Sequence, residues 1–371
     1  SVERTRPIQN VFEQVLRDLQ VPKSVLQFIN YPTRFDSTAT QKALAKARIH
    51  VPPLEDYAWR LWDYWERHLD PDLTIDRSLR GAVRGKVVVV TGGSSGIGEA
   101  AAIRVAEAGG KVIVVARDEE KLAEVRKKIQ DAGGFAKTYS CDITDLAAND
   151  KLAKDILKEF GHVDVLINNA GRSIRRSLAL SYDRFHDFER TMQLNYFACV
   201  RLTMNLLPSM TARKSGHVIN VSSIGVLTNA PRFSADVASK AALVSFARCA
   251  ASEFHDEGVH FTIINMPLVR TPMIAPTKIY EEMPTVISPE EAADMIADAI
   301  IRRPQRIATR LGVMAEIMHL LMPKLSEVVM NSAYRMFPDS SAAQGKKDGG
   351  DQRPATREAM IFASLMRGIH W

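Results

Sequence analysis

A glycine-rich turn is the first feature of the sequence that could do chemistry. The apolar run Val87–Val90 leads directly into Thr91–Gly98, which reads TGGSSGIG, and a helical pattern follows. Glycines allow a tight turn and a close backbone approach to a pyrophosphate, which binds where a helix N-terminus leaves amide groups unpaired. A glycine triplet alone is a weak signal, but the strand–turn–helix context makes a purely structural turn improbable. The sequence therefore predicts a dinucleotide site.

The end of the next predicted strand indicates which dinucleotide binds. This strand ends Val115-Ala116-Arg117. A site specific for NADH usually has an acidic residue here that binds the ribose 2′-hydroxyl. Ala116 lacks this carboxylate, and the guanidinium of Arg117 can bind a 2′-phosphate through charge-assisted hydrogen bonds. An ordinary surface arginine is the alternative, but the position at the strand end favours NADPH.

The elements that must position this site alternate between short apolar runs and helices. Helical patterns such as Gly98–Ala108 and Glu119–Ala132 separate runs that are short enough to be buried strands. This alternation predicts an α/β fold with a doubly wound parallel sheet of the Rossmann type, covered by helices on both faces. The predicted strands are Val87–Val90, Val112–Val115, Ala136–Ser140, Val163–Ile167, His217–Val221 and Phe261–Ile264.

Two helical regions flank this predicted domain, which we place at residues 84–310. Residues 1–83 form a helical extension in which apolar residues recur at helical spacing over 11–19 and 57–65. It either packs on the main domain or docks a preceding domain. Residues 311–371 are expected to form a C-terminal lid and tail, with helices at 311–322 and 323–336, a polar stretch to residue 356 and a last amphipathic segment.

Composition excludes several classes of function. The formal net charge of +6 and three cysteines in 371 residues fit a globular protein of a reducing compartment, and we expect a cytoplasmic location. No nucleic-acid-binding signature occurs. The histidines form no pair with metal-ligand spacing, so the sequence gives no support for a metal site. Glu316, Lys324 and Glu327 interrupt the most apolar C-terminal stretch and argue against a membrane span there.

Further motifs resemble those of the short-chain dehydrogenase/reductase family. The glycine-rich turn is followed by the motif NNAG at 168–171, by Asn195, by NVSS at 220–223 and by ASK at 238–240. As an ordered set over residues 84–275 this pattern is highly specific. The resemblance implies an NADPH-dependent oxidoreductase of the Rossmann type.

The resemblance also implies roles for individual residues. Ser223 would hydrogen-bond the substrate oxygen, Lys240 would bind the nicotinamide ribose and lower the pKa of the acid, and Asn195 would hold a water in the proton relay. Leu268 stands where the family usually has Gly. Together with the residues already discussed, the implied cofactor site comprises Gly92, Ser94, Ser95, Gly96, Ile97, Gly98, Arg117, Asp142, Ile143, Asn169, Ala170, Gly171, Lys240, Pro267, Val269 and Thr271.

One position departs from the family pattern. The family has a catalytic Tyr four residues before the Lys, and here Asp236 occupies that position. Hydride delivery to a carbonyl builds negative charge on oxygen, which needs a proton donor within reach. A carboxyl has an ordinary pKa of about 3.9, and a neighbouring Lys240 would favour its ionised form further. We therefore expect the chain to bind NADPH but to reduce carbonyls very slowly, and we interpret Asp236 as an introduced or accidental change.

The residues after the NNAG motif indicate an anionic substrate. Arg172, Arg175 and Arg176 leave the carboxyl end of a predicted strand, where the substrate cleft of this fold opens. They could bind the phosphates of coenzyme A, although a solvated basic loop is an equal alternative. Methionines recur in the two C-terminal helices, where they could line a pliable wall for an acyl chain or simply pack in a core.

The whole order of segments resembles the C-terminal reductase domain of bacterial alcohol-forming fatty acyl-CoA reductases. This resemblance implies reduction of a long-chain acyl-CoA thioester to a fatty aldehyde, with a preceding reductase domain absent from this chain. Reduction of a fatty aldehyde or oxidation of a lipid alcohol is one alternative, and a non-catalytic NADPH-binding module is another. We also expect a homo-oligomer, and peripheral membrane contact through the C-terminal helices is a weaker expectation.

Overall fold

The computed structural model describes residues 36–50, 52–68, 76–275 and 286–336, together with Asp339 and Ala343. The chain forms two units, one ending at Ile75 and the other beginning at Asp76. In the first unit, α3 (Thr38–Lys46) and α4 (Leu54–His68) are described, and α4 occupies the predicted helical pattern around residue 60. The expected helix at 11–19, most of the polar stretch and the last amphipathic segment lie outside the described residues.

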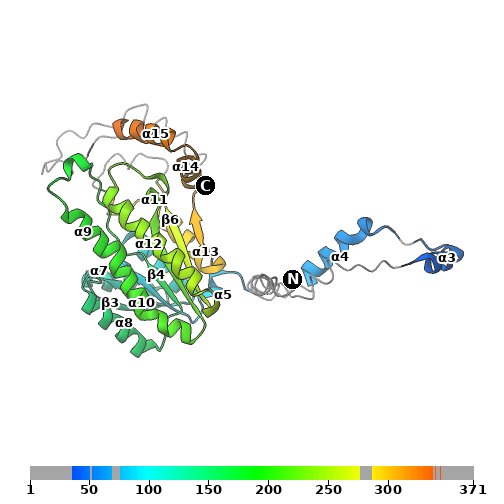
Figure 1. The fold of residues 1–371 in the computed structure, drawn as a ribbon. Coiled ribbons are helices and arrows are strands. Elements are labelled where there is room, and N and C mark those ends of the chain that lie inside the picture. Colours follow the sequence, from blue (N-terminus) through cyan, green and yellow to red (C-terminus); the bar gives the residue numbers. More distant parts are fainter. Residues whose placement is uncertain are drawn as a thin grey trace, which may run out of the picture. The chain divides into compact units, whose positions relative to one another are not determined.

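The second unit contains a sheet of seven parallel strands in the order β3-β2-β1-β4-β5-β6-β7. Figure 1 shows the sheet with the helices that surround it. The prediction of a doubly wound parallel sheet is therefore confirmed. The order reverses between β1 and β4, where the carboxyl ends of the strands leave a crevice. The strands are β1 (Val87–Thr91), β2 (Lys111–Ala116), β3 (Phe135–Ser140), β4 (Val165–Asn168), β5 (Gly216–Ser223), β6 (Val259–Met266) and β7 (Arg306–Ala308).

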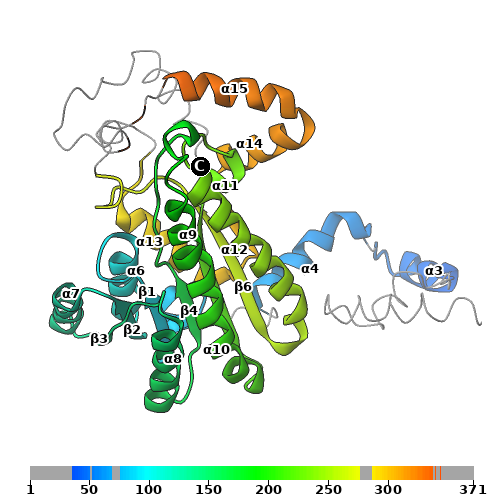
Figure 2. The same ribbon diagram turned by 60° about the vertical axis from the view of Figure 1, so that its left-hand side comes forward.

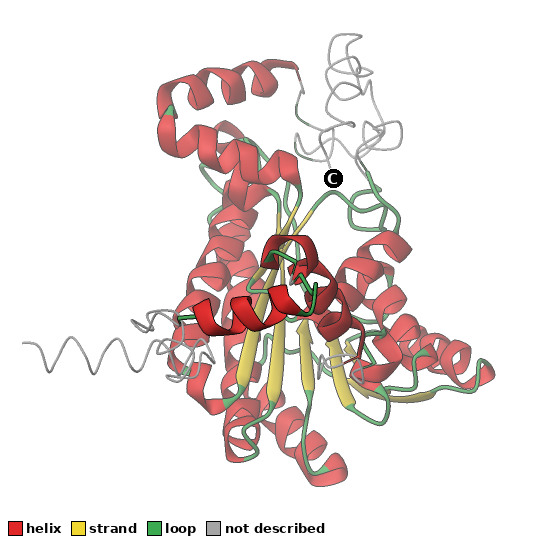
Figure 3. Ribbon diagram, turned by 90° about the vertical axis from the view of Figure 1, so that its right-hand side faces the viewer, coloured by secondary structure: helices red, strands yellow, loops and turns green. Residues whose placement is uncertain are grey.

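Helices cover both faces of the sheet because its central strands are apolar on both sides (Figure 3). Val88 and Val90 face one core, to which three helices contribute: α6 (Gly96–Glu107), α7 (Glu119–Asp131) and α13 (Pro289–Arg302). The short α5 (Leu79–Val83) also packs here. Val87 and Val89 face the other core, to which α8 (Leu146–Phe160), α10 (Cys199–Ala212) and the end of α12 (Ser234–Glu253) contribute.

Side-chain caps determine where several of these helices begin. The carboxylate of Asp145 accepts hydrogen bonds from Ala147 N and Ala148 N at the start of α8. At the start of α13, Ser288 and Glu291 form a reciprocal capping box. Between α9 (His186–Met192) and α10, the backbone widens into a π-helical turn over Gln193–Ala198. Such turns are frequent at functional sites, and this one carries Asn195.

The C-terminal helices lie together beside the short α11 (Gly225–Thr228) (Figure 2). Gly312 of α14 (Arg310–Leu321) packs so closely on α11 that an added Cβ would lie 2.9 Å from Leu227 Cδ1. The following α15 (Pro323–Met336) presents the ring of Tyr334 to the guanidinium of Arg232, 3.9 Å from the ring centroid. None of the described helices is long and apolar enough to span a membrane.

A buried carboxylate fixes the start of the central strands. Asp164 precedes β4, and its Oδ2 accepts a hydrogen bond of 2.8 Å from Val87 N at the start of β1. Arg213 donates to its Oδ1 at 3.2 Å, and Lys86 lies nearby. Burial alone raises the pKa of this carboxyl, but the Val87 and Arg213 hydrogen bonds outweigh burial and hold the pKa below its ordinary value.

We expect Asp164→Ala to lower the free energy of unfolding by about 2 kcal/mol at pH 7, because the Val87 amide loses its buried acceptor. The folded-state pKa is depressed, so the stabilisation is present above about pH 3.9 and is lost as the pH falls through the folded-state value. Urea denaturation of both proteins at pH 7 and at pH 3.5 measures the difference. A difference that stays the same at both pH values would contradict this role.

Candidate active site

A cavity of about 1010 Å³ lies at the carboxyl ends of the strands. It brings together residues that are far apart in the sequence, from the glycine-rich turn after β1 to the segment after β6. The predicted residues that line it are Gly92, Ser94, Ser95, Gly96, Ile97, Arg117, Asp142, Ile143, Asn169, Ala170, Gly171, Arg172, Ser223, Asp236, Lys240, Pro267, Val269 and Thr271. Gly98, Asn195, Arg175 and Arg176 are predicted site residues that do not line it.

The glycine-rich turn has the shape that a pyrophosphate needs. Gly92 and Gly96 have left-handed φ angles of +65° and +57°, which side chains with a Cβ rarely adopt. Gly98 does not line the cavity but lies against the turn, where an added Cβ would be 2.3 Å from Gly92 O. The backbone of the turn and the start of α6 therefore line the cavity, and this cradle fits a dinucleotide phosphate.

Asn169 holds this turn against the end of β4. Its Nδ2 donates hydrogen bonds to Thr91 O at 3.0 Å and to Gly92 O at 3.1 Å. In return, Thr91 Oγ1 accepts hydrogen bonds from the backbone amides of Asn169 and Ala170. These bonds join the two sides of the crevice between β1 and β4.

Arg117 and Asp142 lie at the rim of the cavity, at the ends of β2 and β3. Arg117 Nη1 is 3.8 Å from Asp142 Oδ2, and both side chains are exposed. Lys121 of α7 lines the same end of the cavity, although its sequence position gave no sign of this. A phosphate at this rim would therefore meet two cationic side chains.

Asn195 acts on the cavity through the backbone of Arg172. Its Oδ1 accepts a hydrogen bond of 2.8 Å from Arg172 N, and its Nδ2 donates one of 2.9 Å to Arg172 O. The same Nδ2 lies 2.9 Å from Ser239 Oγ and 3.3 Å from Asp236 Oδ1. Asn195 is fully buried and so positions the residues around it.

Asp236 and Lys240 lie one turn apart on α12 and both line the cavity. Lys240 Nζ donates a hydrogen bond of 2.7 Å to Val221 O of β5, and Ser223 at the end of β5 also lines the cavity. The side chain of Asp236 is buried, and the residue is only 6% exposed. Ser223, Lys240 and position 236 thus line one cavity.

Burial raises the pKa of Asp236 above its ordinary value, although Lys240, Ser173 and Asn195 act in the opposite direction. The sequence-based expectation that Lys240 favours the ionised form is therefore correct in sign, but the expected low pKa of the carboxyl is wrong because the sequence did not show its burial. The physical reason is that α12 buries the carboxyl, and desolvation of the charged form outweighs the attraction of one ammonium group.

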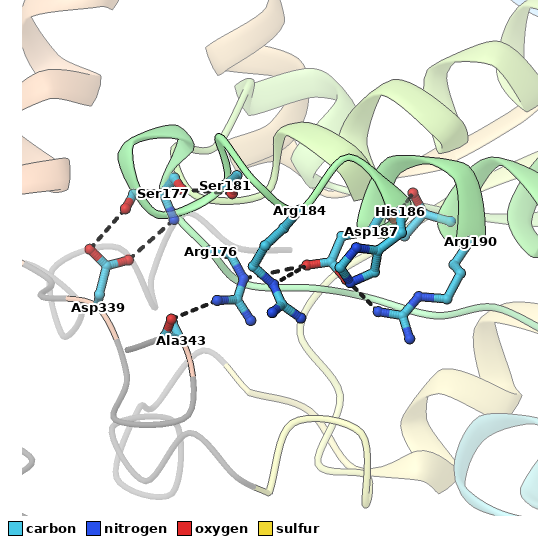
Figure 4. Close-up of polar contacts among 10 residues, drawn as sticks. Arg176, Ser177, Ser181, Arg184, His186, Asp187, Arg190, Asp339 and Ala343 are labelled. Carbon is cyan, nitrogen blue, oxygen red and sulfur yellow. Dashed lines mark hydrogen bonds and ion pairs between the residues drawn. The ribbon is translucent and has the colours of Figure 1, made fainter. Parts of the chain in front are cut away.

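The three arginines after the NNAG motif lie in different surroundings. Arg172 lines the cavity, but Arg176 is only 16% exposed and its Nη1 donates a hydrogen bond of 2.6 Å to Ala343 O (Figure 4). Arg176 therefore contacts Ala343 instead of the cavity, and its grouping with Arg172 in one substrate loop is not supported. The sequence analysis also missed cavity residues, because a helical or loop position alone gave no signal for them: Ser173, Arg190, Gln193 and Met273.

The strand order, the glycine cradle and the Ser–Lys pocket define a dinucleotide-binding oxidoreductase. The family model described as short chain dehydrogenase matches residues 86–281. The chain belongs to this family, which confirms the resemblance stated from the motifs.

The chain is similar to two curated fatty acyl-CoA reductases. That of Acinetobacter baylyi is 52% identical over 297 residues, covering 80% of this chain and 99% of the relative. That of Mycobacterium tuberculosis is 44% identical over 265 residues, covering 71% and 90%. Among solved structures, a metagenomic short-chain oxidoreductase in complex with NADP has 29% identity and a TM-score of 0.53, and the match covers 61% of this chain and 97% of that chain.

We expect Asp236→Asn to raise the free energy of unfolding at pH 8, because it removes a buried carboxylate. The folded-state pKa is raised, so the destabilisation by Asp236 is absent below the ordinary pKa of about 3.9 and grows as the pH rises through the folded-state value. Urea denaturation at pH 4 and pH 8 measures this, with the exposed Asp256→Asn as the control. Equal free energies of unfolding of Asp236→Asn and the unaltered chain at pH 8 would show that burial does not outweigh the groups that lower the pKa of Asp236.

Proposed function

We propose that this chain binds NADPH in the cavity and reduces a long-chain fatty acyl-CoA thioester to a fatty aldehyde, slowly because Asp236 stands where the family has Tyr. The proposal depends most on one observation, the pocket shared by Ser223, Lys240 and position 236 beside the glycine cradle. The similarity to two fatty acyl-CoA reductases supports the substrate class. The related structure that holds NADP supports the cofactor.

Each residue of the pocket would have a separate role in the reduction of the thioester. When bound, NADPH supplies the hydride. Ser223 orients the thioester carbonyl through a hydrogen bond to its oxygen, and Lys240 binds the nicotinamide ribose and tunes the acid at position 236. The residue at 236 must supply the proton to the carbonyl oxygen, and the C–S bond of the resulting thiohemiacetal then breaks, which releases coenzyme A thiol and the fatty aldehyde. Asp236 is shorter than Tyr and lies buried against Asn195, so even its protonated form reaches the substrate poorly.

Restoring the phenol tests the reductase activity. We expect Asp236→Tyr to raise turnover with palmitoyl-CoA and NADPH about a hundredfold, which is a typical contribution of a general acid. Release of free coenzyme A thiol is the measurement, because reduction of an aldehyde releases none. Asp236→Phe is the matched control, since it adds the ring without the hydroxyl and should give no increase.

The result of this assay separates three functions. Thiol release by Asp236→Tyr supports thioester reduction. Consumption of NADPH with hexadecanal but without thiol release from palmitoyl-CoA supports the aldehyde reductase alternative. Tight NADPH binding with no turnover of either substrate supports a non-catalytic module.

Cofactor choice gives an independent test. We expect Arg117→Ala to weaken NADPH binding about tenfold and to leave NADH binding unchanged, because only NADPH carries the 2′-phosphate. Fluorescence titration of the nicotinamide measures both affinities. Arg126→Ala on the same side of the sheet is the control, since Arg126 is exposed but does not line the cavity. Equal weakening of both cofactors would contradict a 2′-phosphate site at Arg117.

A further inference from the structure

One buried carboxylate at the start of α9 is surrounded by cationic side chains (Figure 4). Asp187 is only 4% exposed, and its Oδ2 lies 3.4 Å from Arg176 Nε and 3.2 Å from Arg184 Nε. Its Oδ1 accepts a hydrogen bond from Arg190 Nη2 and lies 3.4 Å from His186 Nε2. Three guanidinium groups and an imidazole therefore converge on one carboxylate.

The charges in this cluster do not balance. Three guanidinium groups carry three positive charges, and Asp187 supplies one negative charge. Glu189, the other acid of this turn of α9, makes no ion pair with these arginines among the described residues. A single arginine would suffice to neutralise a structural carboxylate, and additional like charges repel one another. The surplus positive charge is the property that a bound anion would compensate.

Arg190 carries this surplus to the cavity. Its side chain is 49% exposed and lines the cavity, as does Arg172 from the loop before α9. Arg190 has five N–H donors, and its hydrogen bond to Asp187 uses one of them. Arg176 does not extend this positive charge into the cavity, because it is mostly buried and donates a hydrogen bond to Ala343 O. Asp187 therefore fixes the orientation of Arg190 without occupying its binding capacity.

The position of Arg190 favours the substrate over the cofactor as the source of this anion. The glycine cradle and Arg117 are the candidate partners of the cofactor phosphates. They directly precede α6 and α7, which pack on one face of the sheet. Arg190 comes from α9, which packs against α12, the helix of Asp236 and Lys240. Arg190 therefore lies on the side of the cavity where the thioester would approach Asp236 and Lys240.

We propose that Arg190, oriented by Asp187 and joined by Arg172, binds a phosphate group of the coenzyme A portion of the thioester. This inference rests on the proposed function and deepens it, because it assigns the main contact with the carrier to Arg190, which lies outside the predicted trio of Arg172, Arg175 and Arg176. Of that trio, only Arg172 is retained. A planar guanidinium pairs with phosphate through two parallel hydrogen bonds, which a lysine cannot reproduce.

Calorimetric titration of the full chain saturated with NADP⁺ tests this assignment without any need for turnover. Coenzyme A and pantetheine are the two probes, since pantetheine has the same thiol arm but no phosphate. We expect Arg190→Ala to weaken binding of coenzyme A about tenfold and to leave binding of pantetheine unchanged. Arg190→Lys should recover only part of the loss, and Arg172→Ala, which leaves the Asp187 contacts intact, should weaken binding in the same selective way.

Arg104→Ala is the matched control. Arg104 is an exposed helix arginine, 53% exposed, that pairs with Asp294 and does not line the cavity. The Arg104→Ala variant should bind coenzyme A and pantetheine with the same affinities as the unaltered chain. Circular dichroism melting of each variant shows whether the fold is retained.

Two results would overturn the assignment. In one, Arg190→Ala and Arg172→Ala bind coenzyme A as tightly as the Arg104→Ala control. In the other, Arg190→Ala loses affinity for NADPH and not for coenzyme A, which would assign the cluster to the cofactor. Thiol release from S-palmitoyl pantetheine by Asp236→Tyr tests thioester reduction separately, because this substrate has no phosphate. If Asp236→Tyr reduces S-palmitoyl pantetheine and Arg190→Ala binds coenzyme A with unchanged affinity, the phosphate site is wrong and the proposed function still holds.

Discussion

The crevice between β1 and β4 depends on the hydrogen bonds of Asn169. Where the strand order reverses, the two strands send their connections to opposite faces of the sheet, and nothing in the strand ladder itself holds those connections together. Asn169 supplies this link by donating to Thr91 O and Gly92 O. The Ala170 amide next to it donates to Thr91 Oγ1, and Asn195 fixes the backbone of Arg172 two residues later. Bonds between side chains and backbone therefore hold both the glycine cradle and the Arg172 side of the cavity.

Much of this arrangement could be predicted from the sequence because it follows from local rules. Apolar runs of strand length and a glycine turn after the first strand are recognised directly from neighbouring residues. Parallel strands then bring Ser223 of β5 and the turn after β1 to the same edge without further information. The short β7 (Arg306–Ala308) was missed, because three residues give no periodicity and the strand is defined by pairing with β6.

The features that could not be predicted depend on neighbours distant in the sequence. Arg176 lies four residues after Arg172, so the sequence suggested the same surroundings for both. The partners of Arg176 are instead Asp187 and the Ala343 carbonyl. Arg190 gave no signal because the pattern of α9 does not show which of its polar residues faces the cavity. The pKa of Asp236 was misjudged for the same reason, since Lys240 is visible in the sequence but the degree of burial is not.

The C-terminal segment adds a constraint on the same loops from outside the sheet. Arg232, four residues before Asp236, has a left-handed φ of +72°, which is uncommon for a residue other than glycine and persists only where surrounding contacts require it. Its buried guanidinium donates to Asp339 Oδ1 at 2.9 Å and to Tyr334 O, while its own carbonyl accepts from Arg176 N. Asp339 also accepts from Ser177 (Figure 4). The segment that carries Arg172 and the segment that leads into α12 are therefore tied to each other and to the end of α15. Because both segments border the cavity, the C-terminal helices help to determine the geometry of the site although they do not line it.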